Sequence, residues 1–179
     1  ISGGFETGDR AILSKDLIRL AAKSKPFVCH VLESIDWSKY DVIGLTSTFA
    51  QNIASLALAT AIKERWPNKI IAFGGANMYG KLGRPLMRRF PAIDWIINGE
   101  GDIAFPAAVK RLSIGESVHG IPGLTYRRPG GEIIEQGTAT LANLDDLPHP
   151  DFSDYFRDVQ ARVPELEVAT ELPLEMSRG

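Results

Sequence analysis

The chain has 179 residues, 44% hydrophobic and 23% charged, which is enough to bury the core of one ordinary domain plus an appendage. Its formal net charge is −2 and its 20 Lys and Arg residues are scattered, which argues against a nucleic-acid-binding surface. No apolar run approaches the roughly 18 residues of a membrane span, and no basic-then-apolar leader begins the chain. We therefore expect a cytoplasmic protein.

Residues 1–35 are expected to form a helical N-terminal segment in two pieces. Apolar residues recur at three- and four-residue spacing over residues 12–21, and Pro26 suits the first turn of a second helix. The single cysteine, Cys29, lies among apolar residues and is expected to be buried. One cysteine forms neither an internal disulfide nor a cysteine-based metal site, so no metal ligands are assigned in this chain.

From Asp41 onward, short apolar runs alternate with segments of helical periodicity. The runs at residues 42–46, 69–73 and 93–97 read as buried parallel strands, each followed by a helix. On the first helix, Ala54, Leu58, Ile62 and Trp66 lie four apart and predict the face that packs on the sheet. This alternation predicts an α/β fold with a parallel sheet flanked by helices, Rossmann-like and specifically flavodoxin-like, over residues 36–125.

The texture changes after Gly120. Residues 123–128 and 132–135 read as two strands joined by a turn at residues 129–131, which predicts a β-hairpin. A segment rich in Pro and Asp follows, so residues 126–150 are assigned to the hairpin and a linker, with a domain boundary near Leu147.

Candidate binding residues lie in the three loops that follow the strands, because ligands of open parallel sheets bind at the carboxyl ends of the strands. Consecutive hydroxyl residues in the first loop can cap the next helix or donate to a ligand. Paired glycines in the second allow a tight turn or the close approach of a planar or phosphate-bearing group. In the third, Glu100 stands between two glycines, whereas Asp102 is explained as a helix cap. The candidates are Thr46, Ser47, Thr48, Phe49 and Gln51; Gly74, Gly75, Ala76 and Asn77; Gly99, Glu100 and Gly101.

In their order along the chain, these loops resemble cobalamin-binding domains. In that family a Ser-x-Leu element and a Gly-Gly element embrace the nucleotide tail of the cofactor, and Ser47-Thr48-Phe49 and Gly74-Gly75 stand in the corresponding places. Phe49 departs from the pattern, and the Asp-x-His-x-x-Gly element that supplies a cobalt-ligating histidine is missing from the sequence. The resemblance therefore implies cobalamin bound base-off, with no histidine on cobalt.

A longer stretch, from about Asp36 onward, resembles the N-terminal half of cobalamin-binding radical S-adenosylmethionine (SAM) proteins, especially the group linked to maturation of ribosomally made peptides. The resemblance is carried by residues 55–67, 73–77, 99–102, 121–124 and 144–152. In those proteins the linker leads into a strand like residues 172–179, directly before a Cys-x-x-x-Cys-x-x-Cys motif. It implies that residues 151–179 begin a radical SAM barrel, truncated here, whose iron–sulfur (4Fe–4S) cluster cysteines follow Gly179 and bind the cluster and SAM.

The resemblance implies a metal-binding, cobalamin-dependent radical methyltransferase that acts on an unactivated carbon of a peptide or natural-product substrate. This chain is then the cofactor shelf and holds no catalytic residue itself. Two alternatives stay open: a cofactor-free docking or substrate-binding domain of a radical SAM enzyme, including an oxidative-cyclase-like one, and a regulatory α/β module. The expected partners are a small-molecule cofactor and a peptide or small-molecule substrate, without nucleic acid or membrane.

Overall fold

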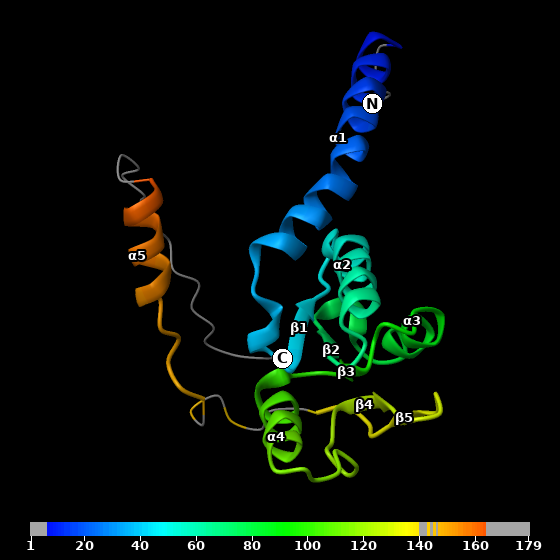
Figure 1. Ribbon diagram of the computed structural model, residues 1–179, viewed down its shortest axis with the longest axis vertical. Coiled ribbons are helices and arrows are strands. Elements are labelled where there is room, and N and C mark those ends of the chain that lie inside the picture. Colours follow the sequence, from blue (N-terminus) through cyan, green and yellow to red (C-terminus); the bar gives the residue numbers. More distant parts are fainter. Residues whose placement is uncertain (1–6, 140–142, 144, 146, 164–179) are drawn as a thin grey trace, which may run out of the picture. The chain divides into compact units, whose positions relative to one another are not determined.

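The computed structural model describes residues 7–139, 143, 145 and 147–163, and the chain divides into two compact units (Figure 1). The first unit is Ile1–Thr140 and the second is Leu141–Gly179. Among the described helices, none combines the length and the hydrophobicity that crossing a membrane requires.

The first unit is built on one sheet of five strands in the order β1-β2-β3-β4-β5. β1, β2 and β3 run parallel to one another, and β4 and β5 form an antiparallel hairpin. The strands are β1 (Val42–Thr46), β2 (Ile70–Gly74), β3 (Trp95–Ile97), β4 (Leu124–Arg127) and β5 (Ile133–Glu135). The predicted α/β fold, with its parallel strands, flanking helices and hairpin, is confirmed.

The hairpin differs from the expectation in one respect, because it is part of the sheet. β4 pairs antiparallel with β3, so that Ile97 lies opposite Leu124, and the sheet is mixed rather than parallel throughout. β3 has three residues, all buried, and the main-chain groups on its second edge need partners away from water. The hairpin provides those partners.

Helices cover both faces of the sheet (Figure 1). α2 (Gln51–Arg65) and α3 (Gly83–Arg89) pack with the strand residues Ile43, Ile71, Phe73 and Ile96, whereas α4 (Gly101–Ser113) packs on the opposite face with the alternate residues Ala72, Trp95 and Ile97. This alternation follows from the two-residue period of a strand. The chain therefore changes from one face to the other directly after β3.

The N-terminal helix differs from the prediction in its continuity and in the exposure of Cys29. α1 (Thr7–Ser34) is one helix that continues through Pro26, so the predicted break is wrong. A proline costs roughly 3 kcal/mol inside a helix, but the turns beyond it are held because Val31 and Leu32 pack against the core. Cys29 is exposed rather than buried, since neighbouring positions of a helix point about 100° apart.

The second unit contains α5 (Ser153–Arg162). The main-chain amide of Ser153 donates to Asp151 Oδ1 at 2.8 Å, and the hydrogen bonds from Ser153 lower the pKa of the Asp151 carboxyl. The strand predicted over residues 172–179 lies outside the described residues, as do residues 140–142, 144 and 146 of the predicted linker.

Candidate ligand-binding groove at the strand ends

The three predicted loops lie next to one another at the carboxyl ends of β1, β2 and β3. The first two are joined by main-chain hydrogen bonds, from Ser47 N to Gly74 O at 2.8 Å and from Asn77 N to Ser47 O at 3.0 Å. The second and third are joined by Gly80 N, which donates to Asn98 Oδ1 at 2.7 Å. The loops therefore form one continuous rim.

The side chain of Ser47 is turned into this rim. It is completely buried, and its hydroxyl donates to Asn52 Oδ1 at 2.9 Å and accepts from Asn77 Nδ2 at 3.2 Å. Asn77 Nδ2 also reaches Phe49 O at 3.4 Å. The hydroxyl and the amide thus hold the first loop to the second, and direct contact of Ser47 or Asn77 with a ligand stays a prediction.

Replacing Ser47 by Ala is expected to lower the free energy of unfolding by about 1–2 kcal/mol, because the half-buried amides of Asn52 and Asn77 each lose a hydrogen bond to the Ser47 hydroxyl. Chemical denaturation measures the change. Ser113→Ala is the matched control, since the exposed Ser113 hydroxyl donates only to Lys110 O, and it should change stability little. Equal effects of the two substitutions would contradict this account of Ser47.

Gly75 is required by the close approach of the first loop. Its φ is +95°, and a Cβ there would lie 2.7 Å from Thr48 Oγ1 and 2.8 Å from Ser47 O, closer than atoms pack. Thr48 is fixed in turn, because its main-chain N donates to Gln51 Oε1 at 3.0 Å. Ala76 follows in the short helix η2 (Ala76–Met78) and is exposed.

Phe49 stands out at the tip of the first loop. Its φ is +48°, which makes it the one non-glycine residue with a positive φ in the described part of the chain, and its side chain is 93% exposed. A bulky residue in this region of φ stores strain, which persists only where the surrounding contacts impose it. Here the hydrogen bonds of Ser47, Gln51 and Asn77 impose it.

The third loop is backed by a segment from far along the chain. Gly99 has a φ of +101° and pairs with Ala139, and Glu100 N donates to Ala139 O at 3.2 Å. Glu100 occupies the N-cap position of α4 with an extended backbone, and Gly101 begins the helix.

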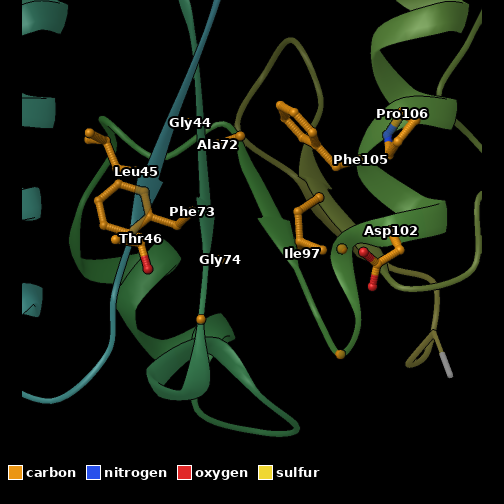
Figure 2. A pocket seen from close by; sticks show the side chains of 13 residues that line it. Gly44, Leu45, Thr46, Ala72, Phe73, Gly74, Ile97, Asp102, Phe105 and Pro106 are labelled. Carbon is orange, nitrogen blue, oxygen red and sulfur yellow. The ribbon is translucent and has the colours of Figure 1, made fainter. Parts of the chain in front are cut away.

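An open groove of about 540 Å³ lies on the α4 face of the sheet, beside this rim (Figure 2). Its floor consists of small residues at alternate positions of two strands, Gly44 and Thr46 of β1 and Ala72 and Gly74 of β2. A Cβ on Gly44 would be 3.9 Å from the ring of Phe105, and one on Gly74 would be 4.0 Å from Ile97 Cβ. The groove therefore lies between these strands and the first turns of α4.

The groove is largely apolar. Figure 2 shows Phe105 reaching from α4 toward the strands, while Asp102 and Ile97 lie near their carboxyl ends. Thr46 and Asp102 supply the polar side chains of the lining. Such a surface suits a flat, mainly apolar group with a polar end.

The predicted site residues are divided by this geometry. Five of them line the groove: Thr46, Gly74, Gly75, Gly99 and Gly101. Seven belong to the rim outside the lining: Ser47, Thr48, Phe49, Gln51, Ala76, Asn77 and Glu100. The other lining residues were not predicted: Gly44, Leu45, Ala72, Phe73, Ile97, Phe105 and Pro106. Asp102 was predicted only as a helix cap, but it lines the groove from the first turn of α4, whose N-cap is Glu100. Small residues two apart in adjacent strands were the signal, because they leave one face of the sheet uncovered.

No family model matches the chain. Among curated proteins, it is 30% identical over 112 residues to the uncharacterized methyltransferase PH0819 of Pyrococcus horikoshii, a match that covers 63% of this chain and 24% of that protein. It is 28% identical over 111 residues to the cobalamin-dependent radical SAM methyltransferase TokK of Streptomyces tokunonensis, covering 62% of this chain and 16% of TokK. The matches thus span a quarter or less of these relatives.

Two solved structures share the fold. Both are of the cobalamin-dependent S-adenosylmethionine radical enzyme OxsB, one with aqua-cobalamin and S-adenosylmethionine bound and one with aqua-cobalamin bound. Each matches with a TM-score of 0.52 at 20% sequence identity, over 64% of this chain and 16% of OxsB. The chain is therefore related in sequence to a cobalamin-dependent radical SAM methyltransferase and has the fold of part of a cobalamin-dependent radical SAM enzyme.

Proposed function

We propose that the chain binds cobalamin and holds the nucleotide tail of the cofactor in the groove on the α4 face. The observation that carries the proposal is the floor of small residues, Gly44, Thr46, Ala72 and Gly74, under an open groove of about 540 Å³. Small-molecule pockets measure about 300–1,000 Å³, and they are mostly apolar with a few polar groups. A planar heteroaromatic base fits such a floor because Gly44 and Gly74 carry no side chain and Ala72 only a methyl group, so the base can come close to the main chain of β1 and β2.

In this proposal the rim residues carry the polar part of the cofactor. Thr46 and Asp102 face the groove, and Ser47, Thr48, Gln51 and Asn77 hold the loops that form its mouth. The rim also includes Phe49 and Ala76, which are exposed, and Glu100, which is the N-cap residue of α4. None of the groove-lining residues is a histidine, which supports base-off binding without a protein imidazole on cobalt.

We further propose that the chain is the cofactor-binding part of a longer radical SAM methyltransferase. Cobalamin supplies methyl-transfer chemistry when it is bound, and the residues of this chain bind and orient it. The 4Fe–4S cluster and SAM belong, in this proposal, to a catalytic domain that follows residue 179. Its substrate is a peptide or natural product, which it methylates at an unactivated carbon.

The spectrum of bound cobalamin tests the ligation. The 179-residue chain mixed with cob(II)alamin is expected to give a base-off electron paramagnetic resonance spectrum, without the splitting that a nitrogen ligand to cobalt produces. His30→Ala, His119→Ala and His149→Ala variants should give the same spectrum. Nitrogen splitting lost in one of these variants would identify a histidine ligand and contradict the proposal, and absence of binding would favour a cofactor-free docking domain.

A further inference from the structure

Asn98, directly after β3, joins three separate segments of the first unit. It is 8% exposed. Its Oδ1 accepts from Gly80 N at 2.7 Å, and its Nδ2 donates to Gly80 O at 3.4 Å and to Gly137 O at 3.3 Å. Its main chain donates to Gly123 O at 2.7 Å and accepts from Ala139 N at 3.1 Å. One side chain therefore fastens the loop after β2 to residues 136–139, here called the strap.

The strap is clamped at Ala139. A Cβ on Gly123 would lie 2.5 Å from Ala139 Cβ, and a Cβ on Gly99 would overlap Ala139 O. Both positions must be glycine for the strap to lie where it does, and both have a positive φ. Gln136 secures the other end, since its Nε2 donates to Val118 O at 3.2 Å and to Leu124 O at 3.3 Å.

The strap and the groove share one peptide segment. Gly99 lines the groove, and the same residue pairs with Ala139. The strap residues themselves do not line the groove. A ligand that packs on Gly99 from the groove side therefore restrains the segment that carries the strap on its other side.

We propose that Asn98 is a positioning residue that couples the groove to the strap, so that cobalamin in the groove and an ordered strap stabilise each other. The coupling rests on the proposed cobalamin site. The hydrogen bonds by which Asn98 holds the strap, here called the lock, do not depend on that site. Coupling between two sites is reciprocal, so loosening the strap weakens the ligand by the same factor by which the ligand tightens the strap.

Amide hydrogen exchange without ligand tests the lock. In Asn98→Ala, the amides of Gly80, Glu100 and Ala139 are expected to exchange roughly tenfold faster, because the main-chain groups of Gly80 and Gly137 lose the hydrogen bonds that hold their segments to Asn98. Asn68→Ala, at an exposed turn residue, is the matched control and should leave these amides unchanged. Faster exchange at Gly80 alone would overturn the lock, because Asn98 would then hold only the loop after β2.

Hydroxocobalamin added to the same samples tests the coupling. In the unmodified chain it is expected to slow exchange at Ala139, and Ala139→Val, which presses on Gly123, is expected to weaken binding about tenfold. Ala57→Val, on the exposed side of α2, is its control. If Asn98→Ala does not fold, the Ala139→Val affinity decides. Unchanged affinity in Ala139→Val overturns the coupling, and so does unchanged exchange at Ala139 when the ligand is bound. If the unmodified chain does not bind hydroxocobalamin, the proposed function is overturned. The ligand-free exchange comparison still tests whether Asn98 holds the strap in place.

Discussion

Replacing Gly74 by Leu is expected to reduce cobalamin affinity by at least about 100-fold, which corresponds to roughly 3 kcal/mol of steric overlap. Gly74 lies on the floor of the groove, and a Cβ added there has Ile97 Cβ, at 4.0 Å, as its one neighbour within that distance. The rest of the leucine therefore projects into the space assigned to the nucleotide tail. Isothermal titration calorimetry with hydroxocobalamin measures the loss.

The fold should tolerate this change, because the nearest atoms are at ordinary contact distance. Ala57→Leu adds a side chain of the same kind to the exposed side of α2, on the opposite face of the sheet, and serves as the control. Both variants should keep their circular dichroism spectrum, and only Gly74→Leu should lose binding. Undiminished affinity in Gly74→Leu would show that the nucleotide tail does not occupy the groove.

Replacing Gly75 by Ala is expected to lower the free energy of unfolding by about 3–4 kcal/mol. Part of this is the cost of a Cβ at positive φ, about 1–2 kcal/mol. The rest comes from the overlap of that Cβ with Thr48 Oγ1 and Ser47 O, which forces the two loops apart. Chemical denaturation measures the difference.

A second glycine separates these two causes. Gly130, in the hairpin turn, has a φ of +103°, but a Cβ there meets nothing within 4 Å. Gly130→Ala should therefore cost only the conformational part, about 1–2 kcal/mol. Equal costs for the two substitutions would contradict the destabilising overlap of a Gly75 Cβ with Thr48 and Ser47.

The order of elements could be predicted from the sequence because each strand is a short apolar run bounded by turn residues. The hairpin could be predicted for the same reason, through Pro129 and the two glycines after it. Its pairing with β3 could not, since nothing local in residues 123–135 says which edge they join. Pairing is decided by the unpaired main-chain groups of β3, a property of the assembled sheet.

Helix faces show the same limit. In the row predicted to pack on the sheet, Leu58, Ile62 and Trp66 do pack with the core, whereas Ala54 is exposed. The fully buried residues of α2 are Leu56, Ala59 and Ile62, so the buried face is rotated from the predicted one. Apolar residues at helical spacing surround α2 on more than one side, and docking on the sheet selects among them. Likewise, the helix propensity of Pro26 did not decide α1, because packing beyond it compensates.

The rule that ligands bind at the carboxyl ends of parallel strands predicts where the candidate site lies. It does not predict which residues line the groove. The sequence pattern pointed to hydroxyl and glycine residues in the loops, but several of these contact one another instead of lining the groove. Asn77 donates a hydrogen bond to Ser47, and the absence of a side chain at Gly75 leaves space for Thr48. The groove is formed by the strand residues that precede these loops, where Gly44 and Ala72 face α4. Which face a strand residue takes is known only once the helices are assigned to faces.

The most direct test of the account compares cobalamin with cobinamide, which has the corrin ring but lacks the nucleotide tail. If the tail lies in the groove over Gly44 and Gly74, the 179-residue chain should bind hydroxocobalamin at least about 100-fold more tightly than diaquacobinamide, a difference of roughly 3 kcal/mol. Titration of each into the chain measures it. Equal affinities for the two, or no affinity for either, would contradict the assignment of the groove as a cobalamin site.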